Sequence, residues 1–249
     1  MGQYYKIVNV DKQEVLDPFD YGNGCKLTEW TYADNDVVLA LMNLIAGYWK
    51  GDRVCVLGDY AEPDNPLEVW YDTLLRYLEG FPPESLYHIS DDFFAHVMSP
   101  VKLRQPGSAT TEEFVKAKVK GDITNHGYRY IYNHATKQVI DISKCPIEGV
   151  WYDNESQQAM VTQIAPLPLL LAMGNGRGGG DYHNEKNENL VGSWCETVQS
   201  VEVSRELIKG TENYTEFAPD FTEQVPLIPY TESQNVLEKE EQKYHQQNS

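Results

Sequence analysis

The sequence predicts an α+β fold, a single domain in which helices pack on a mostly antiparallel sheet. Strand-like and helix-like segments alternate along the 249 residues, of which 41% are hydrophobic, enough for a sizeable core at this length. Residues 128–142 have a hairpin pattern, which makes neighbouring strands antiparallel. Only weak linkers interrupt the chain, so we expect residues 1–230 to form one globular domain.

The first elements form a strand–helix–strand unit. Residues 4–10 are rich in β-branched and aromatic side chains and predict a strand. A turn-rich stretch follows, and a short strand is expected at 25–30. Residues 37–46 are apolar almost all round, which predicts a buried helix. A short apolar strand over 53–57 ends at Gly58.

Capping residues set the helix boundaries. Asp34 or Asn35 caps the helix over 37–46, and Gly47 ends it. A second helix over 66–78 has the clearest start signal in the chain, an asparagine cap followed by proline and an acidic third residue.

The remaining chain contains one short helix, an ambiguous segment and several strands. The short helix is expected to begin at Ser90, and residues 110–120 fit a helix and a strand equally well. Further strands are expected at 128–132, 138–142, 160–164, 191–196 and 200–204. Pro166 and Pro168 are expected to break regular structure after the strand at 160–164. The polar tail, 231–249, lacks an apolar face and is expected to be frayed or disordered.

The charge balance argues against some classes of binding partner. With 38 acidic and 20 basic side chains the net charge is −18, which disfavours direct nucleic-acid binding because phosphates are repelled. A solvated acidic surface and an acidic face for a basic protein partner are both consistent with it. No apolar run suits a membrane span and the first residues do not suit a secretion signal, so we expect a cytoplasmic protein without membrane association.

Cysteine and histidine spacing gives no metal or catalytic signature. The four cysteines form no C-x-x-C pair and are expected to be reduced thiols. No two histidines have ligand spacing, and His134 is assigned to the turn of the hairpin. No metal site is therefore predicted. The catalytic residues and the cofactor are left open, and His183, beside Asp181, is the one histidine whose neighbours would suit an acid or base.

The glycine-dense segment 174–182 is the candidate ligand site. Glycine leaves the backbone free for close approach to a ligand. Its context does not fit a dinucleotide-binding fold, because no apolar helix follows. Flexible connection, tight turns and an anion-holding nest remain open alternatives. In the last case the ligand-binding residues are Asn175, Gly176, Arg177, Gly178, Gly179, Gly180, Asp181 and Tyr182.

Asp59 and Tyr60 are added to this candidate site. They follow Gly58 as Asp181 and Tyr182 follow Gly180, a short repeat for which coincidence in a chain rich in glycine and tyrosine is the alternative explanation. Were the two segments to converge, Asp59 and Asp181 would form a carboxylate pair able to bind a cation or share a proton.

The chain also resembles a family of uncharacterised bacterial and mobile-element proteins. The resemblance is carried by segments 1–6 (MGQYYK), 58–60, 132–134, 167–170 and 175–182 (NGRGGGDY), and covers most of the chain except the tail. Because the family has no assigned activity, the resemblance implies no catalytic residue.

Two functions are therefore carried forward. The first is an acidic binding protein, such as an inhibitor or anti-defence factor, that engages a macromolecular partner through its negative surface. The alternative is a small-molecule or nucleotide-binding protein or enzyme with its site at 174–182. Oligomeric state and the choice between enzyme and binder are left open.

Overall fold

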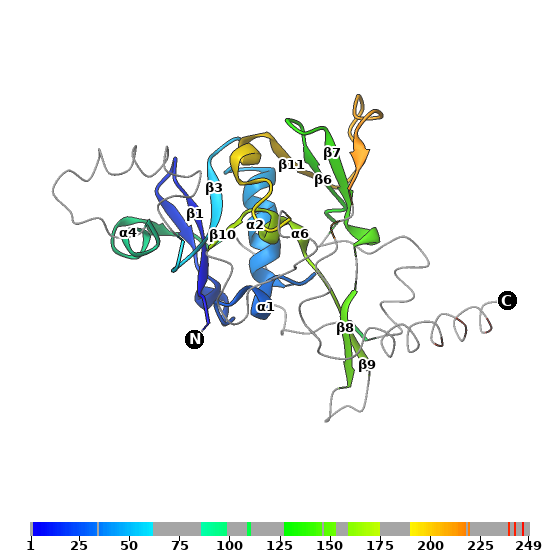
Figure 1. The fold of residues 1–249 in the computed structure, drawn as a ribbon, viewed down its shortest axis with the longest axis horizontal. Coiled ribbons are helices and arrows are strands. Elements are labelled where there is room, and N and C mark those ends of the chain that lie inside the picture. Colours follow the sequence, from blue (N-terminus) through cyan, green and yellow to red (C-terminus); the bar gives the residue numbers. More distant parts are fainter. Residues whose placement is uncertain are drawn as a thin grey trace.

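The described part of the chain comprises residues 2–33, 35–61, 86–98, 109–110, 127–145, 147–152, 159–174, 190–217, 219, 239, 242 and 246 of the computed structural model in Figure 1. Its first sheet has the strand order β10–β3–β1–β2–β4. The bounds are β1 (Tyr5–Asn9), β2 (Glu14–Leu16), β3 (Val54–Gly58), β4 (Ala95–His96) and β10 (Ala172–Met173). β1 is antiparallel to β2 and β3, whereas the edge strands β10 and β4 run parallel to their neighbours.

The second sheet has the order β11–β6–β7–β12 and contains the expected hairpin. Its strands are β6 (Tyr130–Asn133), β7 (Gln138–Asp141), β11 (Val201–Ser204) and β12 (Thr215–Glu216). Asn133 pairs with Gln138, so the hairpin loop is 134–137, one residue shorter than expected. A third, antiparallel sheet contains β5 (Ala109–Thr110), β8 (Ile147–Tyr152) and β9 (Ala159–Gln163). The predicted α+β class is confirmed, with the difference that two sheets are mixed rather than purely antiparallel.

Helix α2 (Asp36–Ala46) lies between the first and second sheets, as Figure 1 shows. The Asn35 side chain caps it by accepting a hydrogen bond from the Val37 amide, and Gly47 ends it as predicted. Apolar side chains from both sheets and from the helix form one core. A helix with a sheet on each side needs apolar residues almost all round, which explains its sequence.

The central strands β1 and β3 of the first sheet are buried on both faces. Ile7 and Val56 point into the core with α2, whereas Val8 and Leu57 belong to a second cluster with Phe94. Helix α4 (Leu86–Phe93) leads into Phe94 on this second side. β1 and β3 are therefore apolar on both sides, and their strand predictions are confirmed.

Two predictions in the N-terminal half are wrong in detail. Residues 25–30 form no strand; instead helix α1 (Leu27–Trp30) places two fully buried side chains three residues apart, which is helical spacing. Helix α4 begins before Ser90, whose hydroxyl donates to the Tyr87 carbonyl within the helix rather than capping it.

Two predictions in the second half are also wrong. Pro166 and Pro168 do not break regular structure, because they open helix α6 (Pro166–Leu170), where the amide hydrogens that proline lacks are not needed. The expected strand at 191–196 is a turn followed by the 3-10 helix η3 (Cys195–Ser200). Gly192 has φ +78° there, a conformation that ends strand pairing.

Several predictions fall outside the described residues. They concern the helix over 66–78, the segment 111–120 and the glycine-dense residues 175–182. Of the tail, Lys239, Gln242 and Gln246 are described and are helical. Among the described helices, none combines the length and the apolar character that crossing a lipid bilayer requires.

Candidate functional site

Asp59 lies where β1 and β3 meet at the end of the first sheet. Tyr5 pairs with Gly58, so Tyr4 lies opposite Asp59. The Asp59 amide donates to the Tyr4 carbonyl at 2.9 Å, and the Tyr4 amide donates to Asp59 Oδ1 at 3.0 Å. The backbone of the neighbouring strand thus fixes the carboxylate of Asp59.

Two exposed tyrosines adjoin Asp59 along the backbone: Tyr4 lies opposite it on the neighbouring strand and Tyr60 follows it in the chain. Tyr4 is 45% exposed and Tyr60 is 40% exposed, whereas Asp59 is half-buried. We call Tyr4, Asp59 and Tyr60 the Asp59 surface. In the described part of the chain, no lysine or arginine pairs with Asp59, and its contacts are those with Tyr4. The surface therefore combines aromatic rings with a carboxylate that no described cation neutralises.

The glycine-dense segment begins beside this surface. β10 runs parallel to β3, with Met173 opposite Leu57, so Gly174 follows next to Gly58. A Cβ atom on Gly58 would lie 2.3 Å from Gln3 Nε2, and one on Gly174 would lie 2.5 Å from the same atom. The fully buried Gln3 amide occupies the space between these two strand ends, and both positions need glycine for that reason.

An ion pair joins β1 to helix α4 on the Val8 face of the first sheet; Lys6 is buried, whereas the Asp91 side chain is 47% exposed. Lys6 is 1% exposed, and its Nζ atom pairs with Asp91 and donates to the Tyr87 carbonyl at 3.0 Å. The same Nζ atom lies 3.7 Å from the centre of the Tyr87 ring. These contacts attach α4 to β1, because an ammonium removed from water needs both a counterion and acceptors.

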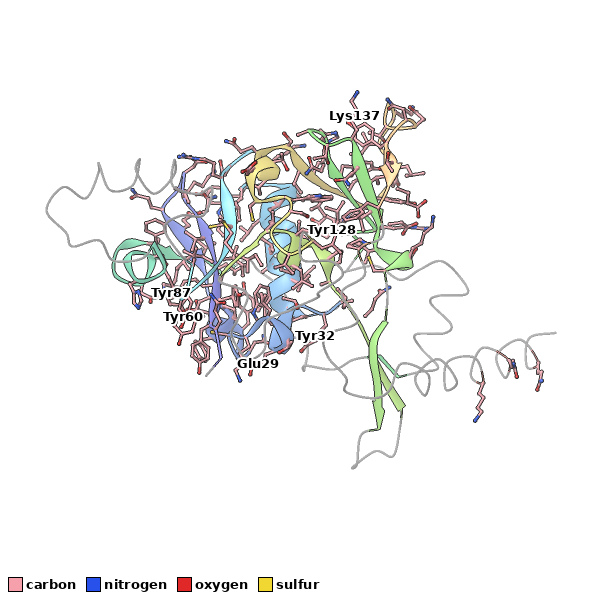
Figure 2. The ribbon with its side chains drawn as sticks, viewed as in Figure 1. Glu29, Tyr32, Tyr60, Tyr87, Tyr128 and Lys137 are labelled. Atoms are coloured by element: carbon pink, nitrogen blue, oxygen red, sulfur yellow. The ribbon has the colours of Figure 1, made fainter. Side chains whose placement is uncertain are left out.

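Several acidic side chains lie around Tyr87 at this end of the first sheet, one of them paired with Lys6. Burial is the largest cause that raises the pKa of the Tyr87 hydroxyl, and Cys25, Asp91, Asp59 and Asp17 raise it further. Burial and the neighbouring Asp17 also raise the pKa of the Cys25 thiol to about 12. Figure 2 shows Tyr60 and Tyr87 at this end of the first sheet. A negative potential here favours a positively charged ligand.

The predicted site residues divide into two groups. Asp59 and Tyr60 lie on the Asp59 surface, with Gly174 close to their strand end. The residues from Asn175 to Tyr182, including Arg177 and Asp181, lie outside the described residues. Over the described ranges, no group of three or more histidine, cysteine, aspartate or glutamate side chains could hold a metal ion.

Sequence reasoning missed a second polar cluster, on the outer face of the second sheet. His134 Nδ1 lies 2.8 Å from the Tyr214 hydroxyl, and His134 Nε2 lies 3.0 Å from Glu202 Oε2. Glu202 is 68 and Tyr214 is 80 residues from His134 along the chain, so no local motif joins them. The pairing of β11 with β6 sets Glu202 opposite Tyr132, and the pairing of β12 with β7 brings Tyr214 to the same sheet.

Comparison with known proteins identified no relative of the chain. No family model, curated protein or solved structure matches the chain.

Proposed function

We propose that the chain is an acidic binding protein whose Asp59 surface takes a basic side chain of a protein partner, as an inhibitor would. One observation carries the proposal: Asp59 is flanked by exposed tyrosines and has no cation partner in the described part of the chain. A guanidinium or ammonium group gains a charge-assisted hydrogen bond from the carboxylate and a cation–π contact from a tyrosine ring.

The charge of the molecule supports the same kind of partner. The net charge of −18 attracts basic surfaces at distances shorter than the screening length of the salt solution. Asp59 and Asp17 are among the acidic groups that act on Tyr87, so part of this negative charge lies at the end of the sheet that carries the Asp59 surface. We therefore expect fast, salt-dependent association.

The backbone contacts of Asp59 support binding in a further way. The Tyr4 amide donates a hydrogen bond to the Asp59 carboxylate, so the carboxylate is oriented before a partner arrives. A preorganised group loses less conformational entropy on binding, and more of the contact energy then appears as affinity.

Titration with a fluorescent oligo-arginine peptide tests the proposal. We expect the peptide to bind in low salt, to dissociate in high salt and to bind more weakly to the Asp59→Asn variant. Glu206→Gln removes the same charge from an exposed position beyond the second sheet and is the matched control. Equal affinity of the two variants would show that net charge alone, and not the Asp59 surface, attracts the peptide.

A second candidate function is a small-molecule or nucleotide site at 174–182, with Asp59 at its edge. The parallel pairing of β10 with β3 favours it, because ligands of α/β proteins bind beyond the carboxyl ends of adjacent parallel strands. A nucleotide panel that raises the melting temperature, and raises it less in the Asp59→Asn variant, would support this function over the first.

A further inference from the structure

Glu202, His134 and Tyr214 form a hydrogen-bonded chain that we call the His134 triad. Glu202 lies on β11, His134 directly follows β6, and Tyr214 directly precedes β12. The imidazole bridges the other two groups, with Nε2 at 3.0 Å from Glu202 Oε2 and Nδ1 at 2.8 Å from the Tyr214 hydroxyl. All three side chains are half-buried, so a small molecule can reach them.

The partners of His134 decide where its proton lies. Lys50 Nζ lies 2.7 Å from Glu202 Oε1, and this contact is the largest cause that lowers the pKa of Glu202, with His134 contributing. An ionised carboxylate only accepts hydrogen bonds, so Nε2 of His134 carries the hydrogen that Glu202 accepts. Nδ1 of the neutral ring then has the lone pair, and the Tyr214 hydroxyl donates to it.

Tyr132 holds the triad in place. Its ring stacks on the His134 ring at a centroid distance of 5.9 Å and an interplanar angle of 6°, and it meets the Tyr214 ring edge-on at 6.2 Å. Tyr132 is fully buried, and its hydroxyl accepts a hydrogen bond from the Ile208 amide at 3.0 Å. The segment that carries Tyr214 is thereby fixed to the sheet, and the phenol stays aimed at the imidazole.

We propose that Tyr214 is an activated nucleophile that accepts an acyl group, with His134 as its general base and Glu202 as the group that orients the base. A nucleophile hydrogen-bonded to a base, which a third group orients in turn, is the arrangement shared by enzymes that form covalent intermediates. This inference rests on the second sheet and is independent of the Asp59 surface.

The acyl transfer balances with the residues present and an activated acyl donor such as N-acetylimidazole. His134 Nδ1 takes the phenol proton while Tyr214 Oη forms a bond to the acyl carbon. The bond from that carbon to the imidazole nitrogen of the donor breaks, and the leaving nitrogen takes the proton from His134. The products are an acetylated Tyr214 and free imidazole, and the His134 ring returns to its neutral form.

Acetylation by N-acetylimidazole, mapped by mass spectrometry, tests the proposal. The exposed Tyr4 and Tyr48 are internal comparators; the hydroxyl of Tyr48 donates to Glu14 rather than to a histidine. We expect Tyr214 to react at least about tenfold faster than both, since general-base catalysis supplies about a hundredfold or more and partial burial takes some of this away. An equal or slower rate at Tyr214 would overturn the proposal.

Two variants distinguish activation of Tyr214 by His134 from mere accessibility of the Tyr214 hydroxyl. His134→Gln should remove the advantage of Tyr214 over the comparators, and Glu202→Gln should reduce it while leaving the base in place. Near-ultraviolet circular dichroism establishes that each variant is folded. A His134→Gln variant that keeps the rapid acetylation would overturn the role of His134, and if that variant does not fold, the Glu202→Gln rate and the wild-type ratio decide the question.

Discussion

Asp59 and Glu202 are both half-buried carboxylates on sheets of the same chain, yet their surroundings differ. Glu202 contacts Lys50 and His134, and these contacts lower its pKa. Asp59 contacts only the backbone of Tyr4 within the described residues, and tyrosines rather than cations flank it. The charge of Glu202 is thus paired inside the molecule, whereas the charge of Asp59 has no described cation partner. This difference is the basis of our proposal that Asp59 recognises a partner.

The largest effect is expected at the buried ammonium of Lys6, which attaches α4 to β1. Asp91→Ala leaves the ammonium of Lys6 without its counterion at a position that is 1% exposed. We expect a loss of about 3 kcal/mol in the free energy of unfolding, measured by urea denaturation, because an unpaired buried charge is strongly unfavourable. The double variant Lys6→Met, Asp91→Ala should recover much of this loss. A change below about 0.5 kcal/mol in Asp91→Ala would show that Lys6 is solvated.

The next effect tests the strand ends that place Gly174 beside Gly58. Gly174→Ala brings a methyl group against the buried side chains of Gln3 and Tyr5. We expect a loss of about 2 kcal/mol on urea denaturation, the usual effect of overpacking a core. Ala95→Ser is the control, because it adds one heavy atom at an exposed position of β4. Equal stability of the two variants would contradict the close approach at Gly174.

Local signals account for the elements that the sequence predicts correctly. Helix α2 has its asparagine cap and its glycine end within the chain itself, and β1 and β3 are apolar enough to be recognised without their neighbours. The predicted break at Pro166 and Pro168 is wrong. Proline interrupts the interior of a helix, but it is tolerated in the first turn, where α6 has it. The strand expected at 191–196 fails because Trp194 and Val198 are buried at helical spacing.

The candidate sites could be predicted only in part, because they combine residues that are far apart in the sequence. Asp59 and Tyr60 could be predicted from a short repeated pattern, but Tyr4 joins them only through the register of β1 with β3. His134 was assigned to a hairpin turn, and the turn is correct. Its partners Glu202 and Tyr214 could not be predicted, because a site built across strands depends on pairings that a single sequence does not specify.

An intermediate effect is expected at Glu202, with a defined dependence on pH. The pKa of Glu202 is lowered from 4.5 in the folded protein, so its contribution to stability is present above that value and is lost as the pH falls through the folded-state pKa. Glu202→Gln should therefore lower the free energy of unfolding by about 1 kcal/mol at neutral pH and flatten its decline in acid. Urea denaturation across this pH range measures both. An unchanged acid profile would show that Lys50 and His134 do not stabilise the Glu202 carboxylate.

The smallest effect on stability is expected at Asp59, and it completes the comparison. Asparagine at this position keeps an oxygen to accept the hydrogen bond from the Tyr4 amide, and no described cation loses a partner. Asp59→Asn should change the free energy of unfolding by less than about 0.5 kcal/mol, the range of ordinary surface substitutions. The same variant should bind the oligo-arginine peptide more weakly, because a neutral amide loses the charge that the guanidinium recognises. If Asp59→Asn instead destabilises the protein as much as Glu202→Gln does, the Asp59 carboxylate is structural and the contrast between the two regions fails.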